Sequence, residues 1–210
     1  MRGLGVAASA LVGLSALGVV VTLVWLWRFK GVYEDYLAGR ATDVELLSQV
    51  EPAVTLSAVG GVVFIAAAVV TAVWLWRVRV NAEALNPGAA HRWGRGAAVW
   101  GWLPVVNFWV PRRVVLDVVG SGASGVPVST VNWWWGTWLS ALVLERFTRL
   151  TSDPESRYFD LSQAVLWAAV CAVLMVAAAV FFVRIVQRVT AWQSDLPTYQ
   201  PGQEAMPPFA

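Results

Sequence analysis

The sequence is poor in charged residues and in the residues that build catalytic or metal sites. Asp, Glu, Lys and Arg make up only 13% of its 210 residues, whereas a soluble domain carries about a quarter. Cysteine occurs once, as Cys171, which excludes an intramolecular disulfide, and histidine occurs once, as His91, which excludes a cluster of histidine ligands. The low charge argues against a soluble globular domain.

The sequence also lacks the patterns that are typical of enzymes. It has no Ser/His, Cys/His or paired-carboxylate arrangement, and the glycine-rich run at residues 120–125 lacks the lysine of a phosphate-binding loop. His91 lies beside Arg92 and is interpreted as a polar loop residue, and Cys171 lies in an apolar run and is interpreted as a small buried hydrophobe. We therefore predict a protein that is not an enzyme and that binds no cofactor or metal.

The polar segment at residues 31–51 holds five acidic side chains. A metal site is one interpretation of these carboxylates, but neither a histidine nor a repeated ligand spacing accompanies them, so a solvated loop is favoured. Thr42 followed by Glu45 is a capping-box pattern, and it predicts the start of a short surface helix.

Long apolar runs take up most of the chain, which is 58% hydrophobic with a mean hydropathy of +0.61. Residues 4–27 and 52–76 are each long enough to cross a hydrocarbon core of about 30 Å at about 1.5 Å per residue. Two further spans are predicted near residues 131–147 and 161–183. The predicted fold is all-α, a polytopic membrane protein with four transmembrane helices in one membrane domain, residues 1–190. The first run exceeds the apolar region of a secretory signal, so an uncleaved helix is favoured over a cleaved signal.

The stretch at residues 92–113, RWGRGAAVWGWLPVVNFWVPRR, is apolar but does not suit an ordinary span. Residues 97–111 are uncharged and too few to cross comfortably, and Pro104 and Pro111 each break or kink a helix. Two interpretations stay open: a re-entrant hairpin that enters and leaves on one side, or a helix in the interface with its tryptophans at headgroup level. The re-entrant form is favoured because Pro104 lies near the middle and Asn107 can hydrogen-bond the carbonyl groups that it leaves unpaired.

Positive charge is unevenly distributed in the predicted topology. With a cytoplasmic amino terminus and four spans, nine arginines lie on the inner side: Arg2, Arg77, Arg79, Arg92, Arg95, Arg112, Arg113, Arg184 and Arg188. Six basic residues lie on the outer side: Arg28, Lys30, Arg40, Arg146, Arg149 and Arg157. This bias predicts a cell-membrane protein with both termini in the cytoplasm. Residues 191–210, rich in Pro and Gln, are predicted to be a disordered cytoplasmic tail.

Two patterns bear on how the helices pack. Small residues recur at every fourth position in the second and fourth predicted spans, which permits close helix approach; they are Ala53, Ser57 and Gly61, and Ala164, Ala168 and Ala172. Residues 21–28, VTLVWLWR, also match residues 70–77, VTAVWLWR. An inverted repeat of the transporter kind is one interpretation. The favoured one is that each helix ends in an aromatic belt followed by a snorkelling arginine.

Several of these residues resemble a known family. They are the Trp-Leu-Trp-Arg end of the second helix at residues 74–77, Asn81, residues 100–111 (WGWLPVVNFWVP) and residues 133–135 (WWW). This pattern is similar to the bacterial membrane proteins catalogued as domain of unknown function 4328, and the resemblance extends from about residue 10 to residue 190. It implies a multi-span membrane protein of high-GC Gram-positive bacteria, and it brings no activity.

Two functions remain for such a protein. The first is a non-enzymatic module that binds membrane lipid, anionic lipid included, or a partner, because arginines beside a membrane recognise anionic headgroups at about 1 kcal/mol each. The residues predicted to make these contacts are Arg92, Arg95, Trp100, Trp102, Pro104, Asn107, Trp109, Pro111, Arg112 and Arg113. The alternative is a small transporter or a subunit of an oligomeric channel, although the four apolar runs, residues 4–27, 52–76, 131–144 and 161–183, lack the ionisable residue that coupled transport uses. A second copy or another membrane protein is the expected protein partner, and nucleic acid is not expected.

Overall fold

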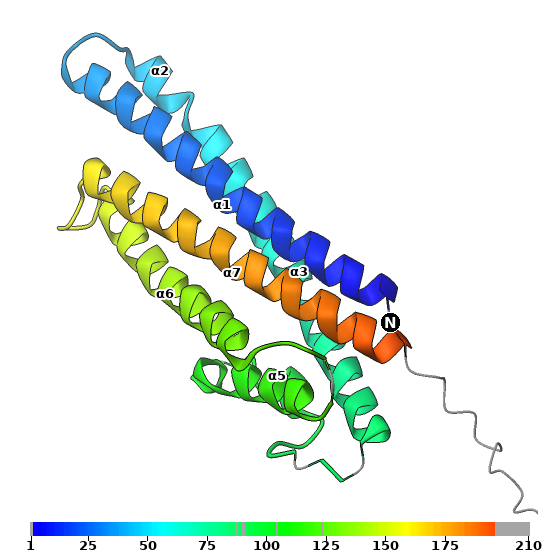
Figure 1. The fold of residues 1–210 in the computed structure, drawn as a ribbon. Helices are drawn as coiled ribbons and strands as arrows, with labels where there is room; N and C mark the ends of the chain where they lie inside the picture. The colour runs from blue at the N-terminus through cyan, green and yellow to red at the C-terminus, as the bar shows by residue number, and fades with distance from the viewer. Residues whose placement is uncertain (1, 87, 90, 104, 123, 196–210) are drawn as a thin grey trace, which may run out of the picture.

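The computed structural model describes residues 2–195 except residues 87, 90, 104 and 123, and within them every regular element is helical. The elements are α1 (Arg2–Leu37), α2 (Asp43–Leu47), α3 (Val50–Leu85), α4 (Ala97–Trp100), the 3-10 helix η1 (Val106–Phe108), α5 (Val110–Gly120), α6 (Val128–Ser152) and α7 (Leu161–Asp195). Figure 1 shows the long helices α1, α3, α6 and α7 running roughly along one axis, while α5 lies across one end. The predicted all-α fold is confirmed.

Three stretches of helix are long and apolar enough to cross a membrane: Arg2–Leu37, Asp43–Leu85 and Leu161–Ser194. They contain three of the four predicted spans and support a membrane protein. The remaining predicted span, near residues 131–147, is not confirmed. A helix, α6, does form there, but polar side chains at its start and Glu and Arg in its last turns shorten its apolar part.

The connection between α1 and α3 follows local sequence signals. α1 ends before Gly39, whose φ of 71° lies in the left-handed region that glycine adopts without strain. The Thr42 hydroxyl then accepts a hydrogen bond from the Glu45 N–H at 3.3 Å, and the Thr42 N–H donates to Glu45 Oε2 at 2.7 Å. This capping box starts α2, so the predicted surface helix is confirmed.

α7 makes the most extensive packing contacts of the long helices, since it packs along both α6 and α1. Its predicted small-residue edge lies in these contacts, because Ala164, Ala168 and Ala172 are all buried. Cys171 is buried beside them, and its Sγ donates to the Ala141 carbonyl oxygen of α6 at 3.5 Å. The close-packing edge of α7 and the interpretation of Cys171 as a small buried side chain are confirmed.

The corresponding edge of α3 is mostly exposed in the described part of the chain, with only Ala53 half-buried. Ser57 and Gly61 are exposed, and a Cβ built on Gly61 would meet no atom within 4 Å. Val59, Val62 and Ile65 of the same stretch are also exposed. The prediction that this edge packs closely against another helix is therefore wrong for the described residues, and the apolar exposure suits a helix that faces lipid.

The two copies of the repeated motif lie at opposite ends of the bundle, because α1 and α3 are antiparallel. Trp25 stacks on Phe29 near the α2 end, with ring centroids 5.3 Å apart. Trp74 is buried at the other end, where its Nε1 donates to Thr190 Oγ1 at 3.3 Å. The two copies of the repeated motif thus make different contacts.

α7 continues into the segment that the sequence predicts as a disordered tail. Trp192 packs so closely against Gly122 that a Cβ on this glycine would overlap the indole ring. The Gln193 side-chain amide donates to the Val78 carbonyl oxygen of α3 at 2.9 Å. These contacts extend the helix, and the remainder of the predicted tail, residues 196–210, lies outside the described residues.

Candidate functional site

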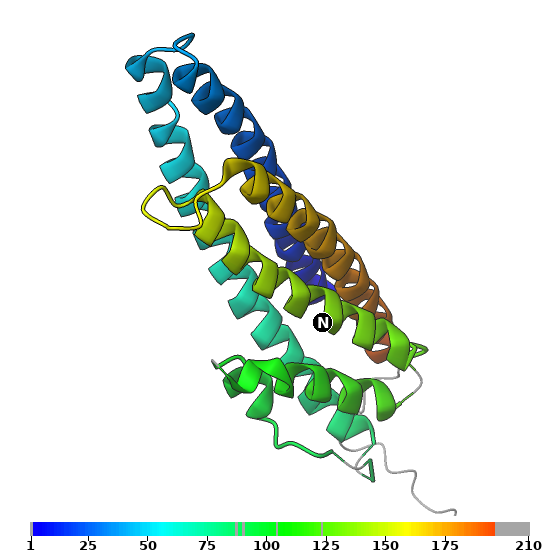
Figure 2. The same ribbon diagram turned by 90° about the vertical axis from the view of Figure 1, so that its left-hand side faces the viewer.

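Residues 86–127, which we name the cap, close the end of the bundle where α1 begins and α7 ends. Figure 2 shows α5 and the turns before it lying across this end. α4 and α5 pack against the last turns of α3, and α5 also packs against α6. Nine of the ten residues that the sequence predicts as headgroup or partner contacts lie in the described part of the cap, and the tenth, Pro104, lies outside the described residues.

The cap contains a tight turn between α4 and α5. Ala97 and Ala98 of α4 are buried, as are Val110 and Pro111 of α5. A Cβ built on Gly101 would lie 2.6 Å from Val110 Cγ1 and would overlap the carbonyl oxygen of Ala97. Only glycine fits this position without displacing its neighbours.

Replacing Gly101 with alanine is expected to lower the unfolding free energy by about 1–3 kcal/mol, because overpacking forces the surrounding atoms to shift. G94A is the matched control, since a Cβ on Gly94 meets nothing within 4 Å. Thermal unfolding of both variants in the same detergent gives the comparison. Equal unfolding midpoints would contradict the close approach at Gly101.

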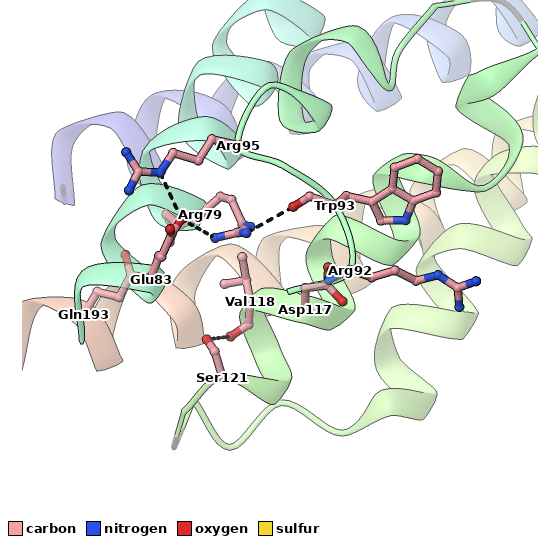
Figure 3. Close-up of polar contacts among 10 residues, drawn as sticks. Arg79, Glu83, Arg92, Trp93, Arg95, Asp117, Val118, Ser121 and Gln193 are labelled. Carbon is pink, nitrogen blue, oxygen red and sulfur yellow. Dashed lines mark hydrogen bonds and ion pairs between the residues drawn. The ribbon is translucent and has the colours of Figure 1, made fainter. Parts of the chain in front are cut away.

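A buried arginine joins the cap to α3. The Arg79 side chain is only 4% exposed, and its guanidinium donates to Glu83 Oε2 and to the Trp93 carbonyl oxygen, both at 3.1 Å (Figure 3). Arg95 Nε donates to the same Glu83 oxygen at 2.9 Å. A buried charge is stable only when it is paired and hydrogen-bonded. This network therefore holds the cap on α3, and it engages Arg95, a predicted headgroup contact, within the protein.

A second set of contacts joins the loop after α3 to α5. The Arg92 N–H donates to Asp117 Oδ2 at 3.1 Å, and Asn86 Nδ2 donates to the Ser121 carbonyl oxygen at 3.0 Å. The Ser121 hydroxyl in turn donates to the Val118 carbonyl oxygen at 2.8 Å. Figure 3 shows the Arg92 side chain directed away from these contacts. Its guanidinium thus stays available at the surface.

The single histidine is enclosed by these contacts. Both ring nitrogens of His91 are buried, and neither has a hydrogen-bond partner among the described residues. Burial lowers the pKa of His91 below its usual value, and Arg79 lowers it further against the opposing effects of Asp117 and Glu83. His91 is a loop residue, as predicted, but its two ring nitrogens are covered rather than solvated. Within the described residues no group of three His, Cys, Asp or Glu side chains is arranged to hold a metal ion.

The stability of the cap is expected to decline as the pH falls below about 6.5, the ordinary pKa of histidine. The folded protein favours the neutral imidazole of His91, so the unfolded chain takes up a proton more readily and acid favours unfolding. H91Q lacks the titrating group and should lose less stability than the wild type between about pH 7.5 and 5.5. Unfolding midpoints in one detergent measure this, and parallel pH profiles for the two proteins would contradict it.

The tryptophans predicted to contact headgroups have different surroundings. Trp102 is half-buried and packs edge-on against Trp138 of α6, with ring centroids 6.0 Å apart. Trp100 pairs with Trp93 at 5.6 Å and is exposed, and Trp109 is exposed as well. Trp102 therefore fixes the cap to the bundle, whereas the other two predicted tryptophans are available at the surface.

The prolines and the asparagine of the central stretch only partly follow the predictions. Pro111 lies in the first turn of α5, where its missing N–H needs no acceptor, so it begins a helix instead of ending or kinking one. Asn107 donates through its backbone N–H to the Leu103 carbonyl oxygen at 2.9 Å. The predicted hydrogen bonds from its amide to carbonyl groups freed by Pro104 concern a residue outside the described part of the chain.

Six large apolar side chains in the described part of the cap are exposed, and we name them the apolar rim: Val99, Trp100, Leu103, Val105, Phe108 and Trp109. Val105 has a φ of 71° and a ψ of −53°, values near those of the rare γ-turn and strained for a β-branched residue. This residue marks the sharp turn between α4 and η1. The cap thus buries one side against the bundle and exposes apolar residues on the other.

The four predicted arginines divide into two pairs. Arg112 donates from Nε and Nη2 to Asn132 Oδ1 of α6 at 3.0 and 2.6 Å, and, like Arg95, it holds the cap in place. Arg92 and Arg113 are exposed, and their guanidinium groups have no partner among the described residues. Only the second pair is free to meet an external ligand.

Two hollows at the same end of the bundle were not part of the predicted site. A cleft of about 160 Å³ is lined by Val126, Pro127, Thr130, Arg184 and Arg188. A shallower, more open groove of about 640 Å³ runs between α1 and α7 and is lined by Arg2, Gly5, Val6, Ser9, Ala10, Val183, Val186, Gln187, Thr190 and Ala191. The sequence contained one indication of the basic side of the cleft: Arg184 and Arg188 are four residues apart, so they share one face of a helix.

Comparison with known proteins gives one match. The family described as Domain of unknown function (DUF4328) matches residues 38–191, a region that includes α3, the cap, α6 and most of α7. No curated protein and no solved structure matches the chain.

Proposed function

Since the chain belongs to the family of the domain of unknown function DUF4328, and this family description names no activity, we propose a function from the physical chemistry of the chain itself. The protein is a non-enzymatic multi-pass membrane protein whose basic end binds anionic lipid headgroups. The observation that carries this proposal is the combination, in the cap, of an exposed apolar rim with exposed arginines whose guanidinium groups have no partner in the described part of the chain.

The apolar rim supports a position of the cap against the bilayer. Exposed apolar surface costs about 25 cal/mol for each Å² kept in water. Tryptophan is favoured where hydrocarbon meets headgroups, and tryptophan and phenylalanine occur on the apolar face of helices that lie in the interface. Trp100, Phe108 and Trp109 supply such side chains, and the guanidinium groups of Arg92 and Arg113 belong to the same cap. An anionic bilayer surface would satisfy both the apolar and the charged groups.

The distribution of charge along the bundle supports the choice of anionic lipid. The cap end carries the nine arginines listed for the inner side, against Glu83, Asp117 and Asp195. The opposite end carries six basic residues and more acidic ones: Glu34, Asp35, Asp43, Glu45, Glu51, Glu145, Asp153, Glu155 and Asp160. Each arginine near an anionic leaflet contributes about 1 kcal/mol. The same bias supports a cytoplasmic cap and cytoplasmic termini in a cell membrane.

Two finer features of the architecture belong to the proposal. α6 is the fourth helix in the membrane, because it packs lengthwise along the apolar helix α7 and so shares its depth. Residues 97–111 lie in the interface, because they form two short helical turns separated by a sharp turn rather than two limbs of a hairpin. This favours the interfacial interpretation over the re-entrant one.

Lipid retention tests the proposed function. The full chain is reconstituted in equimolar phosphatidylglycerol and phosphatidylcholine and extracted in a mild detergent, and the retained lipid is quantified by mass spectrometry. The wild type should retain phosphatidylglycerol preferentially, and R92Q/R113Q should weaken that preference. R28Q/R146Q removes the same charge from exposed arginines at the opposite end, so it should leave the preference unchanged. No preference in the wild type, or equal losses in both variants, would contradict the proposal.

An oligomeric channel is the second candidate, because the exposed apolar edge of α3 leaves room for another copy. Ion flux through vesicles that contain the protein, absent from empty vesicles, would favour it. A single copy that retains anionic lipid without flux would favour lipid binding.

A further inference from the structure

We propose that the cleft between the first turn of α6 and the last turns of α7 is a binding site for a phosphate group. This rests on the proposed function, because it assigns the lipid phosphate of the basic end a specific site. Two kinds of ligand carry such a phosphate group, the headgroup of an anionic lipid and a small soluble phosphate compound, and the test below separates them.

The size and lining of the cleft suit one small anion. Its volume is about 160 Å³, below the range of about 300–1,000 Å³ that is typical of pockets for drug-sized ligands. Arg184 and Arg188 line one side, and Thr130 supplies a hydroxyl on the other. None of the five lining residues is acidic, so the cleft has cations and no carboxylate to balance them.

The two arginines are exposed on one face of α7, and their like charges repel. They lie four residues apart on α7, which puts them on the same helix face, and both line the cleft. Arg188 Nη1 donates to the Gly125 carbonyl oxygen at 2.5 Å, which fixes its guanidinium and leaves its other N–H groups free. Arg184 has no hydrogen-bond or ion-pair partner among the described residues. An anion between them would relieve the repulsion.

The backbone around the cleft adds positive polarity. α6 begins at Val128, directly after Pro127, and no side chain caps its first turn. The Thr130 N–H donates to the Pro127 carbonyl oxygen at 3.0 Å, and the N–H groups of Val128 and Ser129 precede it in the same turn. Because Pro127 and Thr130 line the cleft, the amino end of this 25-residue helix lies beside it with its partial positive charge.

Phosphate fits these donors better than a carboxylate does. A guanidinium binds phosphate oxygens through two parallel hydrogen bonds, and a tetrahedral phosphate has oxygens left for the Thr130 hydroxyl and the helix end. The position in the chain also suits a lipid. Arg184 directly follows the apolar run that ends at Val183, at the level where lipid phosphates lie.

Short-chain lipid binding to the purified full chain tests the site. Binding of dioctanoyl phosphatidylglycerol is measured by native mass spectrometry, with dioctanoyl phosphatidylcholine as the zwitterionic comparison. R184Q/R188Q should weaken phosphatidylglycerol binding by about tenfold or more, because two charge-assisted donors are lost. T130L fills the cleft and leaves every charge in place, so it should weaken binding as well. R28Q/R146Q should bind as the wild type does.

The outcomes separate this site from the proposed function. If R92Q/R113Q weakens lipid binding while R184Q/R188Q and T130L bind as the wild type does, the proposed lipid-binding function stands and the proposed phosphate site in the cleft is contradicted. If every variant and the wild type fail to prefer phosphatidylglycerol, the proposed function and the site both fail. Inorganic phosphate is added as a competitor of the lipid. If it displaces the lipid only from proteins with an intact cleft, a small soluble phosphate compound is the favoured ligand. If it does not displace the lipid, the lipid headgroup is the favoured ligand. Unfolding midpoints identify any variant that is misfolded, and the remaining cleft variant then decides.

Discussion

Replacing Trp74 with alanine is expected to destabilise the folded protein by about 3–5 kcal/mol, the range for deleting a large buried aromatic side chain. Trp74 is 1% exposed. It packs edge-on against Phe182 with ring centroids 5.8 Å apart, and it donates to Thr190 Oγ1 at 3.3 Å. Its loss would leave a cavity between α3 and α7 and an unpaired hydroxyl beside it. Thermal unfolding in detergent should show a large fall in the midpoint or a loss of folded protein.

The repeated motif supplies the control for this prediction. Trp27 belongs to the first copy of the motif and is 65% exposed, so W27A removes the same kind of side chain without opening a cavity. Surface substitutions away from packed regions change stability by about 0.5 kcal/mol or less. If W74A and W27A unfolded at the same temperature, the packing between α3 and α7 would be wrong.

Replacing Arg79 with alanine is expected to cost about 3 kcal/mol, because it removes two hydrogen bonds made by a buried charged group. The side chain is 4% exposed, and it connects Glu83 on α3 to the Trp93 carbonyl oxygen of the cap. Without it the carbonyl group loses its donor and the loop after α3 loses its attachment. Limited proteolysis should then cut within residues 86–96 at protease concentrations that leave the wild type intact.

An exposed ion pair at the other end of the molecule gives the comparison. Arg40 donates to Asp35 at 2.6 Å, but both side chains are more than half exposed. Such a surface pair contributes about 0–1 kcal/mol, so R40A should have little effect on either measurement. A fall in stability as large for R40A as for R79A would show that burial of Arg79 does not set the strength of its contacts.

The sequence predicts those parts of the fold that depend on local signals. Run length is enough for the long helices, and the Thr42–Glu45 pair is enough for the start of α2. α5 also had a usable signal, because Val114, Val115 and Val118 repeat at helical spacing and are all buried. That pattern after Pro111 indicates a helix that begins at the proline, and it outweighs the helix-breaking interpretation.

The remaining features depend on which elements meet in three dimensions. Ser57 and Gly61 on α3 repeat at the same spacing as Ala164 and Ala168 on α7, yet only the alanines are buried. A small-residue edge permits close approach, but it does not say which helix is near. The enclosure of His91 is also set by contacts distant in sequence. The sequence therefore indicated the candidate site only as a region, residues 92–113, and only the structure separates its engaged arginines from its exposed ones.

The depth of the apolar rim in a bilayer tests most directly the central claim that the cap lies on an anionic membrane surface. Spin labels are attached at F108C and, for comparison, at A89C on the loop after α3, both with Cys171 replaced by alanine, in bilayers that contain phosphatidylglycerol. The label at position 108 should lie about 5–10 Å into the boundary between headgroups and acyl chains, and the label at position 89 should lie in water. A label at position 108 that is as accessible to aqueous relaxation agents as the one at position 89 would contradict the account.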